Sequence, residues 1–286
     1  GNGTTQWDLT LKGVGIGSST SLSSGIGNIF IAGHSIDSGN ISGASAVALN
    51  ASVSISATSG TIHIYGITNT IGPTSNSTGF SAGVEMAGVY NTTTALTIKN
   101  SSTATDAIVI SGDAHTAAAK PSSGIASISW CDAADSGPRN IIANTSSGGI
   151  IMTGRSGTAE NGLTNDLIGD GIELNGTAVL SKSGKITFNG DTSVTTATNS
   201  YGLSFNHTTY TGSNNGCTSK SYRGVSYIGG GYATTIDGVA MNASSANIEM
   251  NVDSLRNVSS AGTFATTSGT VKIQPASNSV VMQNFD

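Results

Sequence analysis

The sequence predicts an all-β chain wound as a right-handed parallel β-helix, a β-solenoid with coils of irregular length. Short phrases of alternating apolar residues recur along the 286 residues, and Gly, Ser, Thr and Asn interrupt every potential helix. Charged residues make up only 9% of the chain, far below the usual share of about 25%. Because one short unit cannot bury its apolar face alone, such units have to stack on one another.

The first phrase consists of Ser-Gly, an apolar-x-apolar strand and usually a closing Gly. Side chains alternate along a strand, so both apolar residues of each copy point to one side and the residue between them points to the other. That outward residue is usually polar, as at His63, Thr187 and Lys272. The copies are residues 59–66, 147–154, 183–190 and 268–275, with a weaker copy at 26–33.

The second phrase is Gly-apolar-x-apolar, which begins at Gly83, Gly171, Gly202 and Gly238. The last three copies are 202 − 171 = 31 and 238 − 202 = 36 residues apart. The clearest unit, residues 171–190, contains both phrases, with residues 179–180 as a short strand between them. We therefore expect coils of about 20 residues, which gives about fourteen coils and a rod of roughly 65 to 70 Å.

Asparagine follows the last inward residue of many units. Asn adopts left-handed backbone angles at little cost, and stacked Asn amides can hydrogen-bond from layer to layer. We therefore predict turn and ladder roles for Asn50, Asn175, Asn189, Asn206, Asn242 and Asn251.

Composition excludes several classes of function. The net charge is −5 and the 11 Lys and Arg are scattered singly, so we expect no nucleic-acid partner. No run approaches the 18 to 20 or so apolar residues of a membrane helix, so we expect no membrane span in this segment. Because the chain opens in repeat-like sequence, residues 1–286 are interpreted as one solenoid segment of a longer protein. Cys131 and Cys217 are predicted to be independent thiols.

Two stretches depart from the repeat and supply the candidate surface-binding residues. Residues 112–140 could be a loop whose Trp binds carbohydrate between carboxylates, or a turn whose Trp fills a packing gap. The tyrosines of residues 206–237 could form a binding surface or cap a flank of the solenoid. The candidates are Trp130, Asp132, Asp135, Arg139, Tyr210, Tyr222, Tyr227 and Tyr232.

Catalytic chemistry has one weak candidate. Asp166, Asp170 and Glu173 lie close in sequence, and two carboxylates on an exposed face can flank a glycosidic bond. The four His are isolated and no metal-ligand or phosphate-loop spacing occurs. We therefore predict no catalytic residues, no metal, no cofactor and no enzyme.

With its two alternating phrases, the chain resembles the repeat regions of filamentous-haemagglutinin-like exoproteins, the large adhesins of two-partner secretion. The likeness is best over residues 25–111 and 140–275. It implies the shaft of a right-handed parallel β-helix that is exported to the cell surface and serves adhesion, aggregation or biofilm cohesion. The secretion domain of that family, with its Asn-Pro motifs, has no counterpart here.

The functional hypothesis is a non-catalytic adhesive or structural segment, extracellular and on a bacterial surface. Its expected partners are host or bacterial surface glycans or proteins, or copies of itself in a filament. The alternative is a β-helical polysaccharide lyase or glycosidase of tailspike type that uses the carboxylates above. Ice binding by Thr arrays is a weaker rival, because Thr92–Thr94 and the pair Thr195–Thr196 do not recur at one register.

Overall fold

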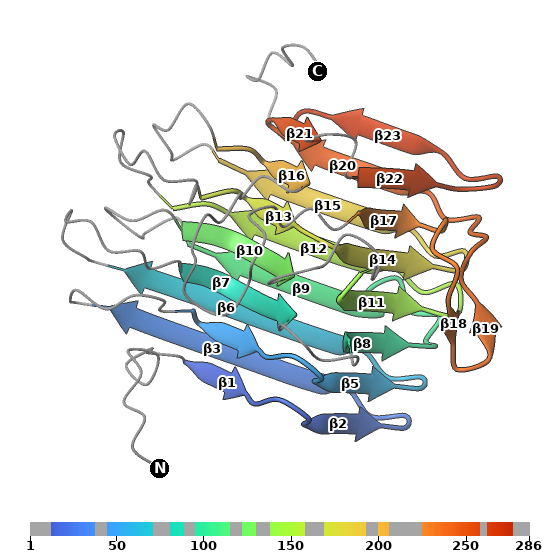
Figure 1. Cartoon of the computed structure of the whole chain (residues 1–286), viewed down its shortest axis with the longest axis horizontal. Helices are drawn as coiled ribbons and strands as arrows, with labels where there is room; N and C mark the ends of the chain where they lie inside the picture. Colours follow the sequence, from blue (N-terminus) through green and yellow to red (C-terminus); the bar gives the residue numbers. More distant parts are fainter. Residues whose placement is uncertain are drawn as a thin grey trace, which may run out of the picture.

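The computed structural model describes residues 13–37, 45–70, 81–88, 95–114, 122–129, 138–157, 169–192, 200–205, 225–257 and 262–276. Within these ranges every regular element is a β-strand (Figure 1). Three sheets of seven parallel strands run the length of the stack, and a two-stranded antiparallel hairpin is added to them. This confirms the predicted class, an all-β parallel β-solenoid with coils of unequal length.

Successive strands of the chain fall in three sheets in turn, so three strands make one coil and the described chain makes seven coils. Sheet A holds β1 (Val14–Ile16), β4 (Val47–Leu49), β7 (Ser81–Gly88), β10 (Ser122–Ser129), β13 (Ile172–Leu174), β16 (Leu203–Phe205) and β21 (Leu255–Asn257). Sheet B holds β2 (Ser21–Ser24), β5 (Ser54–Ala57), β8 (Leu96–Asn100), β11 (Asn140–Asn144), β14 (Thr177–Ser181), β17 (Ser226–Gly229) and β22 (Gly262–Ala265). Sheet C holds β3 (Ile29–Asp37), β6 (Ile62–Thr70), β9 (Ile108–Asp113), β12 (Ile150–Arg155), β15 (Ile186–Asp191), β20 (Ile248–Val252) and β23 (Val271–Gln274).

The coil length predicted from the sequence is wrong. Residues in register in sheet A show that the shortest coil, from Ile172 to Leu203, spans 203 − 172 = 31 residues, and the longest, from Leu203 to Leu255, spans 255 − 203 = 52. The 20-residue unit 171–190 is three strands, β13 to β15, and the chain needs further residues to return from sheet C to sheet A. Seven layers at about 4.8 Å separate the first and last strands by roughly 29 Å.

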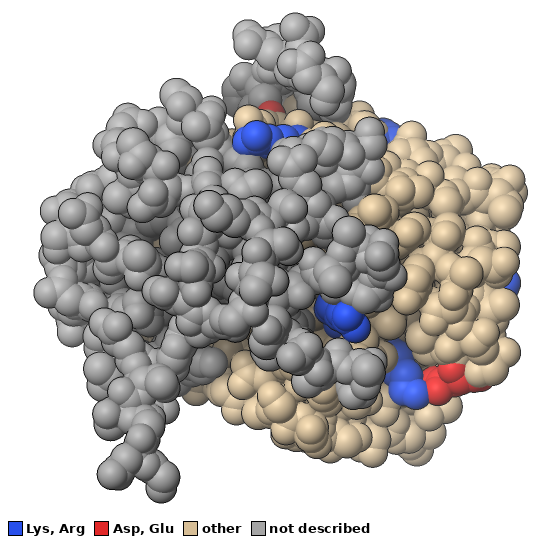
Figure 2. Space-filling model, in the orientation of Figure 1, with Lys and Arg blue, Asp and Glu red and all other residues tan. Residues whose placement is uncertain are grey.

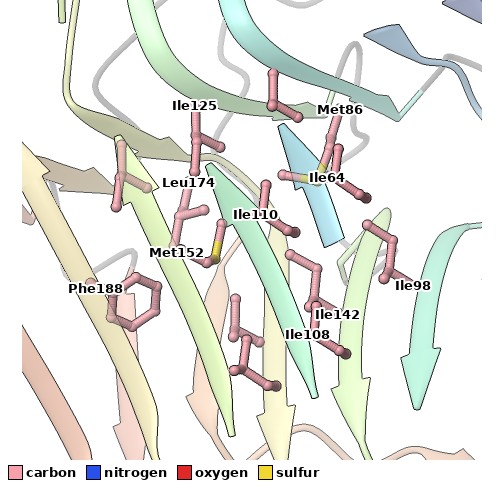
Figure 3. Close-up of a cluster of buried hydrophobic side chains, with 14 of the residues drawn as sticks. Ile64, Met86, Ile98, Ile108, Ile110, Ile125, Ile142, Met152, Leu174 and Phe188 are labelled. Atoms are coloured by element: carbon pink, nitrogen blue, oxygen red, sulfur yellow. The ribbon is translucent and has the colours of Figure 1, made fainter. Parts of the chain in front are cut away.

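The core lies between the three sheets and is built from the inward residues of the phrases (Figure 3). In β9, β12 and β15 buried residues alternate with half-buried ones, as the phrase predicts. The inward stack on sheet C includes Ile64, Ile110, Met152 and Phe188, all fully buried. Burial of these side chains is the main stabilising term, at about 25 cal/mol per Å² of apolar surface.

Three glycines that close the first phrase meet three that open the second, and one further pair of glycines meets in the same way. A Cβ on Gly66 would lie 1.8 Å from the carbonyl oxygen of Gly83, and one on Gly154 would lie 1.9 Å from that of Gly171. Sheets C and A therefore approach backbone to backbone along a line that we call the glycine seam. Its pairs are Gly66 with Gly83, Gly112 with Gly124, Gly154 with Gly171 and Gly190 with Gly202.

A short hairpin, β18 (Thr235–Ile236) and β19 (Val239–Ala240), is inserted between β17 and β20 and packs on the outer face of sheet B. Ile236 and Met241 cover Ile141 and Leu180, which belong to a second hydrophobic cluster outside the main core. The phrase copy at Gly238 thus forms the end of the turn and the second strand of this hairpin and not a strand of sheet A, because its apolar residues are used to cover sheet B.

Candidate functional site: the outer face of sheet C

Every second residue of sheet C points away from the core, and the strand register stacks these residues into rows parallel to the solenoid axis. Because neighbouring strands lie about 4.8 Å apart, each row is a regular array of side chains on a flat surface. The first row is Phe30, His63, Val109, Ile151, Thr187, Glu249 and Lys272. The second is Ala32, Tyr65, Ser111, Thr153, Asn189, Asn251 and Gln274.

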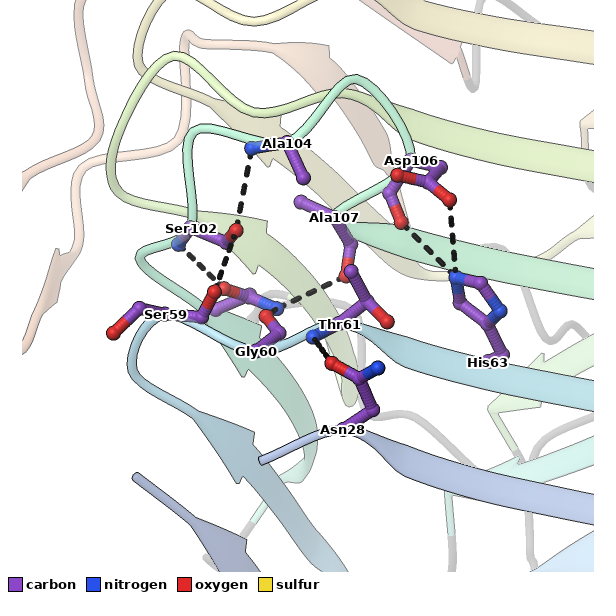
Figure 4. Close-up of polar contacts among 10 residues, drawn as sticks. Asn28, Ser59, Gly60, Thr61, His63, Ser102, Ala104, Asp106 and Ala107 are labelled. Atoms are coloured by element: carbon purple, nitrogen blue, oxygen red, sulfur yellow. Dashed lines mark hydrogen bonds and ion pairs between the residues drawn. The ribbon is translucent and has the colours of Figure 1, made fainter. Parts of the chain in front are cut away.

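The first two coils give this face an aromatic end. Phe30 is 68% exposed, and its ring centroid lies 5.4 Å from that of Tyr65. The His63 ring meets Tyr65 edge-on at 6.0 Å. His63 Nε2 lies 3.2 Å from the backbone oxygen of Asp106 and 3.5 Å from its carboxylate, which orients the imidazole (Figure 4).

Turns between sheets B and C hold the aromatic strands in register. The side chain of Asn28 accepts a hydrogen bond from the Thr61 amide at 2.9 Å, one coil further along. Asn100 donates to the carbonyl oxygens of Gly60 and Ala107, both at 2.9 Å. Because these side-chain amides form their hydrogen bonds within the stack, each strand that follows a turn begins at a fixed position along the solenoid axis.

The last three coils give the face a polar end with an amide ladder. Asn251 donates to Asn189 at 2.8 Å, and Asn189 donates to the Thr153 hydroxyl at 3.2 Å. Gln274 extends the ladder by donating to Asn251 at 2.5 Å. The predicted ladder role is therefore confirmed at Asn189 and Asn251. Asn175 is instead buried between β13 and β14, and Asn206 lies outside the described residues.

Charges on the face are few, and several of them form ion pairs. Arg155 lies between two carboxylates, with its nitrogens 3.5 Å from Asp113 Oδ2 and 3.3 Å from Asp191 Oδ2. Lys185 forms an ion pair with Glu249, and this hydrogen-bonded ammonium lowers the pKa of Glu249 below its ordinary value. On the opposite side of the molecule, which Figure 2 shows in the orientation of Figure 1, the described surface likewise carries few charged side chains.

Three of the sequence-predicted binding residues are described, and the structure places them away from sheet C. Tyr227 and Tyr232, with ring centroids 5.2 Å apart, pack half-buried against the cluster beneath the β18–β19 hairpin on sheet B. Arg139 precedes β11, and its backbone bonds to Leu96 and Gly176. The other candidates lie outside the described residues: Trp130, Asp132, Asp135, Tyr210 and Tyr222, together with Cys131 and Cys217.

The two candidate carboxylates that the structure describes are buried, one just before β13 and one on it. Asp170 is 0% exposed, and its carboxylate accepts hydrogen bonds from the Tyr201 amide at 2.8 Å and from the Ser204 hydroxyl. Glu173 is 0% exposed on β13. Asp166 lies outside the described residues. The hydrogen bonds to the Asp170 carboxylate hold the corner of the chain just before β13, so Asp170 has a structural role.

Sequence reasoning missed the aromatic end of sheet C, although its signal was present. Phe30 and His63 occupy the same outward position of two phrase copies, and Tyr65 lies two residues after His63. Aligning the copies and following only the outward positions would have brought these residues together.

The described part of the chain contains no helix that could cross a membrane and no group of three or more potential metal ligands. Comparison with protein-family models, with curated proteins and with solved structures found no match.

Proposed function

We propose that this chain is a non-catalytic adhesive segment of an extracellular bacterial surface protein, and that the outer face of sheet C is its contact surface. The observation that carries the proposal is the in-register array of that face, which runs across all seven coils. Phe30 and Ile67 stand exposed at one end, and an amide ladder occupies the other. The resemblance to filamentous-haemagglutinin-like shafts supports the same function.

The construction of the solenoid suits such a role. Seven coils joined by in-register ladders and by the glycine seam make a stiff support, so the backbone that presents sheet C loses little conformational freedom on binding. Repeated shallow contacts along a row raise avidity without a deep pocket. Glycans or proteins of host or bacterial surfaces are the proposed partners.

The alternative is a polysaccharide lyase or glycosidase that uses Asp170 or Glu173. Such chemistry needs two carboxylates that reach the sugar from opposite sides. Both side chains are buried here, and the Asp170 carboxylate accepts hydrogen bonds that shape its own corner of the fold. These observations favour the adhesive proposal over the enzymatic one.

The test is to incubate the purified chain with bacterial and host polysaccharides and score both retention and newly formed reducing or unsaturated ends. We expect retention without new ends. New ends that disappear in Glu173→Gln would overturn the proposal in favour of an enzyme. Glu85→Gln is the matched control, because Glu85 occupies the position of Glu173 in the same outward row of sheet A.

A further inference from the structure

Large apolar side chains are exposed mainly in the first two coils. Of the exposed large hydrophobic residues in the described structure, Ile26, Phe30, Ile36 and Ile67 lie there, with exposures of 88%, 68%, 59% and 47%. The last three point outward from β3 and β6, which at nine residues each are the longest strands described. Exposed apolar patches of this kind mark interaction sites.

Polar groups are interleaved with the apolar ones on the same two strands. His34 Nε2 and Asn69 Nδ2 are 3.0 Å apart, and His63 is held by Asp106. We define the aromatic patch as Phe30, His34, His63, Tyr65, Ile67 and Asn69. Its rings therefore alternate with oriented hydrogen-bonding groups on one flat surface.

The patch is also almost without charge. The described residues 13–37 and 45–70 contain no Lys, Arg or Glu and a single Asp, Asp37. The far end of the same face holds Lys185, Glu249 and Lys272 instead. Two carboxylates border the patch: Asp106 lies against His63, and Asp113 is in register with Ile67 and paired with Arg155. A polyanion would meet these carboxylates and, among the described residues of the patch, no Lys or Arg to replace its counterions, which favours an uncharged ligand over a polyanion.

Neutral sugars combine the two properties that the patch presents. A pyranose ring has a face of C–H groups, which stacks on aromatic rings, and an edge of hydroxyls, which hydrogen-bond to imidazole and amide groups. We infer that the aromatic patch binds uncharged glycans, with a sugar ring on Phe30 or Tyr65 and its hydroxyls directed to the histidines and Asn69. This inference rests on the proposed adhesive function and names its ligand class.

A second copy of the chain is a poorer occupant of the patch. Packing the apolar side chains of another sheet onto this surface would remove His34, His63 and Asn69 from water without new partners, which is costly for polar groups. Sugar hydroxyls replace the lost water contacts. The mixed character of the surface thus favours a glycan.

The experiment titrates the purified chain against immobilised neutral oligosaccharides of glucose, mannose and galactose, with heparin oligosaccharides as the anionic comparison. We expect binding to at least one neutral series and not to heparin. The double variant Phe30→Ala, Tyr65→Ala should weaken that binding about tenfold or more, because each lost ring removes stacking and buried area. Ser23→Ala, at an exposed outward position of sheet B and therefore off the contact surface, should leave it unchanged.

Four results would overturn the inference. The first three are binding to heparin alone, neutral binding that survives the double variant, and dimerisation in sedimentation that the double variant abolishes without any retention on sugars. Retention of whole cells by the double variant at the wild-type level would remove the glycan assignment while leaving the adhesive proposal intact. Phe30 is largely exposed, so its replacement leaves the core in place.

Discussion

Two phenylalanines on sheet C differ in the direction in which they point. Phe188 faces inward on β15 and is fully buried between Met152 and Met250, whereas Phe30 faces outward on β3 and is 68% exposed. Alternation along the strand decides which of the two stabilises the fold.

Replacing Phe188 by Ala should therefore lower the free energy of unfolding by about 3–5 kcal/mol, through lost apolar burial and the cavity left behind. The matched change Phe30→Ala should alter it by less than about 0.5 kcal/mol. Urea unfolding followed by circular dichroism measures both. Equal losses in the two variants would contradict the assignment of inward and outward faces.

The Lys185–Glu249 pair gives a pH dependence whose sign follows from the lowered pKa of Glu249. Because the folded state holds this carboxyl below its ordinary pKa, the stabilisation is full above the ordinary value of about 4.3 and is lost as the pH falls through the lowered value. Both side chains are partly exposed, so the effect is small. Thermal melts at low salt should show wild type and Glu249→Gln converging at acid pH, and a constant gap between them would contradict the pairing.

At the scale of elements, the glycine seam joins sheet C to sheet A. A methyl group on Gly154 would meet the Gly171 carbonyl oxygen at 1.9 Å, and backbone cannot yield as a flexible side chain would. Gly154→Ala should therefore destabilise the chain by about 1–3 kcal/mol or more through overpacking. Gly17→Ala is the control, since a Cβ there meets nothing within 4 Å. A denaturant midpoint unchanged in Gly154→Ala would refute the seam.

The β18–β19 hairpin is the second element with a separable role. Met241 is buried against the outer face of sheet B, while Ala240, its neighbour, is exposed. Met241→Asp should open the hairpin and expose Leu180, which dye binding to apolar surface and faster amide exchange near β14 would report. Ala240→Asp should do neither, and similar behaviour of the two variants would contradict the packing.

The strands of sheet C were easier to predict from the sequence than the number of residues in each coil. The Ser-Gly phrase found five of these strands, but β9 and β20 follow Ala107 and Asn247 and lack the signal. The hairpin was missed because Ile141 and Leu180 face outward, and only a contact from a distant insertion buries them. The length of a coil depends on the segment that leads from sheet C back to sheet A, and the sequences of these segments have no period.

At the scale of the whole molecule, a stack of seven coils presents one flat contact surface. Nearest-neighbour stacking supplies the stability, so no single coil has to be stable alone. Glu173 is buried on sheet A and sheet B is partly covered by the hairpin, whereas sheet C presents exposed side chains on its outward face. The central claim is that attachment occurs through this face.

The most direct test measures attachment of bacterial and host cells to the immobilised chain after one negative charge is added to each face in turn. Ile67→Glu places it on sheet C, and Ser23→Glu places it on an exposed outward position of sheet B. We predict that Ile67→Glu reduces attachment at least several-fold while Ser23→Glu leaves it at the wild-type level. Equal attachment by both variants, or a loss only in Ser23→Glu, would contradict the claim that sheet C is the contact surface.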